Sequence, residues 1–194
     1  MDYPSRELMI TRKIAITIIL TALCIGTNYA LLPFFNIKFM DFIVFVGGFC
    51  FGPLVGGLVG VFSWAIYGSI NPLGFSLPVW ISTMVGEAFF GVCGGLVKLF
   101  VFRKSSRIVN DKPASAVFFA VSSLFLTLAY DLFTNLAYAY TYGINFIVAI
   151  SVGFVPFGIM HLLSNAVFFG VGCVPAINII SKVTGGEKTV SNEK

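Results

Sequence analysis

Apolar residues fill most of this chain, and most of the charged residues lie in short stretches between the apolar runs. From Phe42 to Gly86 there is no Asp, Glu, Lys or Arg. About 20 apolar residues in a helix cross the hydrocarbon core of a bilayer, so this stretch alone is long enough for two passes. Six apolar runs follow one another, at 14–32, 40–51, 54–67, 77–102, 115–140 and 155–180. The pattern predicts an all-α integral membrane protein, with residues 1–194 forming one membrane domain of six helices.

Glycine and proline mark the connections between these runs. Gly52-Pro53 separates the second helix from the third, and Pro fits at the start of a helix because its missing donor would have no partner there. Glycines repeat at spacings of four around this turn, which predicts close approach of helix backbones in lipid. The segment 143–155 has a polar start and contains glycine, so we expect an extended outer loop or a shallow cap there.

The composition agrees with a membrane location. Hydrophobic residues make up 58% of the chain and charged residues 10%, and the mean hydropathy is +0.96. Soluble domains carry about 25% charged residues, so a soluble protein is excluded. The four cysteines form no C-x-x-C pair, and no phosphate-binding Gly-x-x-x-x-Gly-Lys-Ser/Thr loop occurs. We therefore expect no disulfide framework, no metal site and no ATP hydrolysis by this chain.

Basic residues predict the orientation in the membrane, because Lys and Arg gather on the cytoplasmic side. In a six-helix topology, three groups fall on one side: Arg6, Arg12 and Lys13; Lys98, Arg103, Lys104, Arg107 and Lys112; and Lys182, Lys188 and Lys194. Lys38 is the one basic residue on the other side. We expect a multi-pass protein of the cell membrane with both termini in the cytoplasm and a first helix that is retained.

Ionisable and amide side chains inside the apolar runs are the candidate functional residues, because such groups are costly in a membrane. They lie in the predicted outer half of five helices, with Asp41 at the start of the second. Asp131, Asn135 and Tyr138 share one helical face, and so do His161 and Asn165. The pattern predicts a pocket open to the outside, with interhelical hydrogen bonding as the alternative. The candidate substrate-binding residues are Asn28, Tyr29, Lys38, Glu87, Asp131, Asn135, Tyr138, His161 and Asn165.

A stripe of small residues on the first helix is a second candidate feature. Ala22, Gly26 and Ala30 recur every four residues and could seat another helix closely. That helix could belong to a partner protein or to this chain, and the sequence leaves both readings open.

Several motifs, taken in order, resemble those of the substrate-binding (S) components of energy-coupling factor (ECF) transporters, the vitamin-uptake branch of the ABC transporters. The first is Phe51-Gly52-Pro53-Leu54-Val55-Gly56-Gly57-Leu58-Val59-Gly60, which is similar to the family pattern F-G-P-x-x-G-x-x-x-G. The others begin at Glu87 (E-A-F-F-G-V-C-G-G-L), Tyr130 (Y-D-L-F-T-N) and His161 (H-L-L-S-N-A). The resemblance covers nearly the whole chain.

The resemblance implies a function and partners. Family members bind a vitamin at the outer face and associate with a transmembrane coupling protein and two ABC ATPases, so ATP-driven uptake is expected to need those partners. They contact the coupling protein through an Ala-x-x-x-Ala motif on the first helix, which Ala22-Leu23-Cys24-Ile25-Gly26 matches with Gly in place of one Ala. Members that transport cobalt or nickel use a His near the N-terminus, whereas His161 is the single histidine here, so we expect an organic micronutrient.

Two other function classes remain as alternatives. A proton-coupled secondary carrier could use Glu87, Asp131 and His161 as a relay, although such carriers usually show internal repeats, and none is clear here. An intramembrane zinc hydrolase would need clustered ligands that one histidine does not supply. We therefore expect a non-enzyme without a cofactor or a nucleic-acid partner, whose substrate is a heteroaromatic, hydrogen-bonding or partly cationic small molecule.

Overall fold

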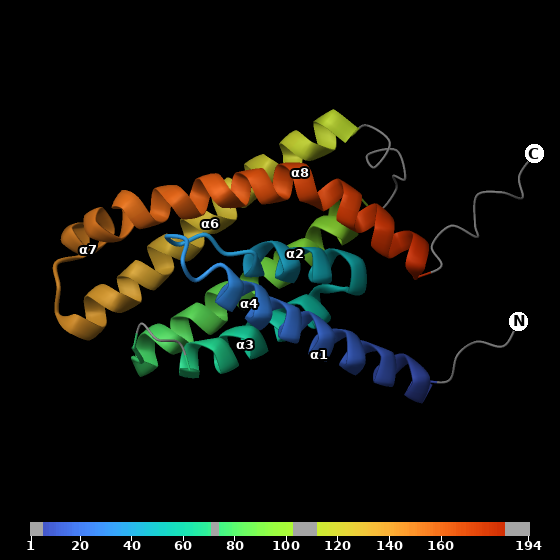
Figure 1. Cartoon of the computed structure of the whole chain (residues 1–194), viewed down its shortest axis with the longest axis horizontal. Coiled ribbons are helices and arrows are strands. Elements are labelled where there is room, and N and C mark those ends of the chain that lie inside the picture. Colours follow the sequence, from blue (N-terminus) through green and yellow to red (C-terminus); the bar gives the residue numbers. More distant parts are fainter. Residues whose placement is uncertain (1–5, 71–73, 103–111, 185–194) are drawn as a thin grey trace, which may run out of the picture.

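The computed structural model describes residues 6–70, 74–102 and 112–184, and these residues form helices and short connections without a strand (Figure 1). Within these described residues, five stretches are long and apolar enough to cross a membrane: Glu7–Ala30, Pro53–Ile70, Leu77–Phe100, Pro113–Tyr142 and Phe146–Val183. The chain is therefore an all-helical, multi-pass membrane protein. The elements are α1 (Arg6–Ala30), α2 (Met40–Phe51), α3 (Pro53–Ile70), α4 (Leu77–Phe100), α6 (Lys112–Tyr142), α7 (Phe146–Gly153), the π-helix η1 (Phe154–Gly158) and α8 (Ile159–Val183).

The helices run roughly along one axis, so the bundle has two distinct ends (Figure 1). One end, here called the α7 end, carries α7 and the connection between α1 and α2. At the opposite end α1 begins and α8 ends (Figure 1). Of the basic residues used to predict the orientation, Arg103, Lys104, Arg107, Lys188 and Lys194 lie outside the described residues.

Helix α2 has 12 residues, fewer than any of the stretches long enough to cross a membrane, and lies at the centre of the bundle. Its bounds match the predicted 40–51, and residues 40–49 are all buried. It packs against α1, α3, α4 and α8, which explains why it is apolar around its whole circumference. Twelve residues span about 18 Å, less than the hydrocarbon core, so α2 does not cross a membrane by length alone.

The predicted turn between the second and third helices is confirmed. Pro53 is the first residue of α3, and Gly52 ends α2 with a φ of 102°, a conformation that favours glycine. The Gly52 amide donates to the Gly48 carbonyl at 2.8 Å, which closes the last turn of α2. The turn reverses the chain within one residue and sets α3 directly beside α2.

Glycines also allow the closest backbone contacts of the bundle. Gly48 on α2, Gly56 on α3 and Gly91 on α4 meet so closely that a Cβ atom on any of them would overlap the backbone of another. The sequence prediction that these glycines pack helices together is confirmed for this three-helix contact. It fixes α2, α3 and α4 relative to one another, and so positions Asp41 and Glu87.

The segment 143–155 was expected to be an extended outer loop or a shallow cap, and the extended loop is wrong because a short helix forms there. Residues Phe146–Gly153 form α7, because Asn145 caps the helix by accepting a hydrogen bond from the Ile147 amide at 2.9 Å. Val155 has non-helical backbone angles, and α8 begins at Ile159 rather than 155. The other predicted helices exist, but α1, α3 and α6 begin or end several residues beyond the predicted limits.

Candidate functional site

His161 joins two carboxylates from different helices in the interior of the bundle. Its Nε2 lies 2.6 Å from Asp41 Oδ2 on α2, and its Nδ1 lies 2.9 Å from Asp131 Oδ1 on α6. His161 and Asp41 are 0% and 1% exposed, and Asp131 is 8% exposed. The imidazole therefore ties α8 to α2 and to α6 through one side chain.

The two hydrogen bonds determine the net charge of this triad. Each bond needs one proton between the ring nitrogen and the carboxylate oxygen. The two protons are present either as an imidazolium between two carboxylates or as a neutral imidazole with one carboxylic acid. Both arrangements carry a net charge of −1, so a buried negative charge remains whichever proton position is taken.

Asn165, one helical turn after His161, extends this network. Its Nδ2 donates to Asp41 Oδ2 at 2.6 Å and to Thr127 Oγ1 on α6 at 2.8 Å. Asn165 and Thr127 are both fully buried. The structure thus brings together His161, Asn165 and Asp131, as the sequence predicted, and adds Thr127 to them.

Glu87 on α4 lies beside the triad and is held by a tryptophan. The Trp64 indole on α3 donates to Glu87 Oε2 at 3.2 Å, and the Trp80 indole donates to the Trp64 carbonyl at 3.1 Å. Glu87 is completely buried and interacts electrostatically with both Asp41 and Lys38. A second carboxyl group from another helix therefore lies close to Asp41.

Lys38 is a positive group that interacts electrostatically with Asp41 and Glu87. It comes from the connection between α1 and α2, and its ammonium lies 4.9 Å from the ring centre of Trp64 and 6.0 Å from that of Tyr130. Both distances are in the range of cation–π contacts. The residue predicted to lie on the outer side thus reaches inward to the aromatic wall of the site.

Together these residues form the polar cluster, defined as Asp41, Glu87, Asp131, His161 and Asn165. Several of its buried oxygens have no hydrogen-bond partner within the described part of the chain: Asp41 Oδ1, Glu87 Oε1, Asp131 Oδ2 and Asn165 Oδ1, joined by the Tyr130 hydroxyl and Asn28 Oδ1. Unpartnered buried polar atoms are rare in folded proteins because each costs free energy. Asp131 Oδ2 and Asn165 Oδ1 therefore have unused capacity to accept hydrogen bonds, whereas the carboxyl groups of Glu87 and Asp41 are within hydrogen-bonding reach of each other.

The remaining candidate residues lie around the polar cluster rather than in it. Asn28 is buried against Met40 at the start of α2, with its Nδ2 3.8 Å from the sulfur. Tyr29 is 37% exposed and donates to the Ile70 carbonyl at 3.1 Å. Asn135 donates to the carbonyl of Asp131 on its own helix and packs against Gly153. Tyr138 is exposed and packs on Tyr142 with ring centres 4.6 Å apart.

Cavities near the α7 end differ from the open pocket that the sequence predicted. One, of about 320 Å³, is lined by Trp64, Trp80, Phe75, Tyr138 and neighbours, and another of about 320 Å³ lies under α7 against Asn135. The polar cluster itself is buried and lines neither of these two. Trp64 connects the two regions, since it lines the first cavity and also binds Glu87.

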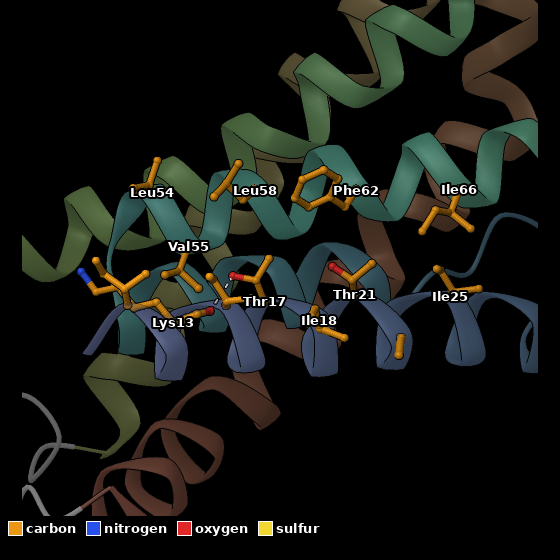
Figure 2. A pocket seen from close by; sticks show the side chains of 13 residues that line it. Lys13, Thr17, Ile18, Thr21, Ile25, Leu54, Val55, Leu58, Phe62 and Ile66 are labelled. Carbon is orange, nitrogen blue, oxygen red and sulfur yellow. Dashed lines mark hydrogen bonds between the residues drawn. The ribbon is translucent and has the colours of Figure 1, made fainter. Parts of the chain in front are cut away.

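A larger hollow than these two lies elsewhere, as an apolar groove of about 730 Å³ between α1 and α3 (Figure 2). Isoleucine and leucine side chains of both helices line it, with Lys13 at one end. Ala22 lines this groove, and Ala22, Gly26 and Ala30 are all exposed. A Cβ on Gly26 would meet nothing within 4 Å, so no part of the described chain packs against the stripe there.

Four residues of the site were not among the predicted binding residues: Asp41, Trp64, Tyr130 and Thr127. The sequence placed Asp41 at the start of the second helix but did not assign it to the pocket. Trp64 and Tyr130 are aromatic residues in apolar helices, where aromatic side chains are common for reasons of packing alone. Thr127 lies one helical turn before Asp131, and this spacing was the signal that could have found it.

No cluster of three or more metal-ligating side chains suited to a metal ion occurs in the described ranges.

Comparisons with known proteins give no relative for this chain: no protein-family model, no curated protein and no solved structure matches it.

Proposed function

We propose that this chain is the membrane-embedded substrate-binding component of an ECF transporter, and that it binds a vitamin or related organic micronutrient near the α7 end. The observation that carries the proposal is the polar cluster, in which α2, α4, α6 and α8 place ionisable groups with unpartnered oxygens inside an apolar bundle. Intramembrane ionisable groups generally mark a substrate or ion pathway. The proposal includes six membrane helices with α2 as the short central one, and both termini in the cytoplasm.

The exposed face of α1 supports the second half of the proposal, that of a coupling partner. Small residues at four-residue spacing allow a neighbouring helix to approach closely, and here they are exposed beside an apolar groove. We propose that a transmembrane coupling protein packs on this face, and that two ABC ATPases drive uptake through it. The sequence contains no phosphate-binding loop of its own.

A proton-coupled secondary carrier is the second candidate. It is favoured by the His161 bridge between Asp41 and Asp131, since a histidine between two carboxylates can pass a proton from one to the other. The two candidates differ in what drives accumulation of the substrate.

Vesicles that contain the purified chain alone are expected to bind a micronutrient but not to accumulate it. ATP inside the vesicles should drive accumulation only when the coupling protein and both ATPases are also present, because this chain supplies no nucleotide site. Radiolabelled candidate vitamins measure both binding and uptake, and protein-free vesicles with the same label are the control. Accumulation by the chain alone under a proton gradient would contradict the ECF proposal and favour the carrier.

The substitution Gly26→Leu is expected to weaken the complex with the coupling protein at least tenfold, because a bulky side chain would hold the two helices apart. Substrate affinity and thermal stability should stay close to wild type, since nothing in the described chain lies within 4 Å of a Cβ at this position. Pull-down with the coupling protein and a substrate-binding assay measure the two effects. Gly26→Ala, which restores the Ala-x-x-x-Ala pattern, is the matched control and should bind the partner normally. An intact complex with Gly26→Leu would exclude this face as the docking site.

A further inference from the structure

We propose that the apolar groove between α1 and α3 binds one acyl chain of an anionic phospholipid, and that the Lys13 ammonium binds the phosphate of that lipid. This inference does not depend on the proposed function, because the groove lies apart from the polar cluster and from the cavities at the α7 end. The bound lipid would fill the space that the two helices leave between them.

The groove is deep because α1 places small side chains where it faces α3. Thr17 and Thr21 are the buried residues of α1 that line it, whereas larger lining side chains such as Ile18 and Phe62 are exposed. The Thr17 hydroxyl donates to the Lys13 carbonyl at 2.9 Å. The Thr21 hydroxyl has no partner among the described residues, but rotation of its side chain would give it the same bond, to the Thr17 carbonyl. The walls therefore suit a hydrocarbon chain rather than a polar ligand.

The length of the groove matches one leaflet of a bilayer. Figure 2 shows Lys13 and Leu54 at one end and Ile25 and Ile66 at the other. At 1.5 Å per residue, the stretch 13–25 is about 18 Å long. One leaflet contributes about half of a hydrocarbon core that is roughly 30 Å thick. An acyl chain whose headgroup lies at the Lys13 end would therefore reach about the middle of the bilayer within the groove.

The width of the groove favours a lipid chain over a helix. Spread over this length, the volume of about 730 Å³ gives a mean cross-section of about 40 Å², and a helix about 10 Å across needs roughly twice that area. Gly26 and Ala30 of the proposed docking face for the coupling protein do not line the groove, and Ala22 is the residue of that face that does. A bound lipid and a docked partner helix can therefore be present together.

The charge at one end of the groove indicates an anionic headgroup. Lys13 is exposed and is the one charged residue among the described residues that line the groove. Arg12 beside it adds a second positive charge, and Glu7, six residues earlier, adds one negative charge, so these three residues carry a net positive charge. Lysine and arginine near a membrane surface attract anionic lipids, and basic pockets between transmembrane helices bind their headgroups. A phosphate on Lys13 would fix the depth of the acyl chain in the groove.

Native mass spectrometry of the purified full chain tests the proposal, because it counts the lipids bound to each protein molecule. The probes are dioleoyl phosphatidylglycerol, which is anionic, and dioleoyl phosphatidylcholine, which has the same acyl chains but no net charge. The first phosphatidylglycerol should bind about fivefold more tightly than the first phosphatidylcholine, the gain expected from one lysine. Glycerol phosphate, which carries the charge without acyl chains, should not bind measurably.

Two variants, each with a matched control, connect the binding to this groove. Lys13→Gln should lower the affinity for phosphatidylglycerol about fivefold, to that for phosphatidylcholine. Arg12→Gln removes the same charge from an exposed residue that does not line the groove, and it should keep most of the preference. Leu58→Trp should fill the groove and weaken the binding of both lipids about tenfold. Leu124→Trp on α6, where leucine is also 38% exposed, should leave lipid binding unchanged.

Several results would overturn the assignment. Equal binding of the two lipids, or an equal loss of preference in Arg12→Gln and Lys13→Gln, would show that Lys13 does not hold a headgroup. Unchanged lipid binding by Leu58→Trp would place the lipid elsewhere on the protein. A dimer that Leu58→Trp disrupts would assign the groove to a second copy of this chain. A complex with the coupling protein that is lost in Leu58→Trp but kept in Leu124→Trp would assign it to a partner helix.

Discussion

The substitution His161→Leu is expected to reduce the free energy of unfolding by about 3–5 kcal/mol, the largest loss for any single change in the polar cluster. Leucine has a similar volume, so the change leaves packing nearly intact but removes both hydrogen bonds. Asp41 and Asp131 would then be buried without their shared partner, and removing one member of a buried ionic pair typically costs this amount. Because His161 joins α8 to both α2 and α6, the loss should affect the bundle as a whole.

Denaturant unfolding in detergent, followed by the fluorescence of the two tryptophans, measures this loss. Ser164→Ala is the matched control on the same helix, since the Ser164 hydroxyl donates to the backbone carbonyl of His161 one turn earlier. It should change stability by less than about 1 kcal/mol. A loss of the same small size for His161→Leu would show that the imidazole bridge does not hold the helices together.

A combined variant separates two origins of the stability lost in His161→Leu, namely unpaired carboxylates and lost packing. If the loss arises mainly from unpaired carboxylates, replacing Asp41 and Asp131 by Asn together with His161→Leu should recover part of the lost stability, because neutral amides are less costly to bury. If it arises from lost packing, the combined variant should be no more stable than His161→Leu alone.

The polar cluster was largely predictable because its members are costly in an apolar helix and therefore stand out. Asp131, His161, Asn165 and Glu87 could be identified one by one, and helical periodicity showed which share a face. The pairing of His161 with Asp41 was not predictable, because the two are 120 residues apart and their distance depends on how α2 and α8 pack. Helical periodicity also did not show that Asn135 and Asp131 have different neighbours. The two share a helical face, yet Asn135 packs against α7 while Asp131 bonds His161.

Local structure at the α7 end was harder to predict for a different reason. The segment 143–155 is apolar after Asn145, but its length falls short of a membrane helix and its glycines favour a loop. One side-chain cap, Asn145 on the Ile147 amide, is enough to start α7. The helix then packs on α6, so the tertiary contact compensates for a weak local preference.

The second large prediction concerns glycine-to-alanine substitutions, which should have opposite effects on stability at Gly91 and at Gly26. Gly91 lies on α4 where the backbones of α2, α3 and α4 meet, and a Cβ there would overlap the backbone of Gly56 and Gly57. Gly91→Ala therefore requires the helices to separate, and it should destabilise the protein by about 3 kcal/mol, the upper end of the cost of overpacking. The atoms nearest to this Cβ belong to the backbone, so no flexible side chain could move aside to make room for it.

Gly26→Ala adds the same methyl group to α1, where a Cβ meets nothing within 4 Å. Alanine is a better helix former than glycine by about 1 kcal/mol, so this variant should be as stable as wild type or slightly more stable. Thermal unfolding of both variants and of the wild type in the same detergent measures whether each substitution lowers or raises stability. Equal destabilisation by both would contradict the arrangement of α1 described here, because it would require a neighbour packed on Gly26. A loss of stability for Gly91→Ala without a loss for Gly26→Ala would support an interior contact at Gly91 and a free outer face at Gly26. A free outer face on α1 is what docking of a partner helix requires.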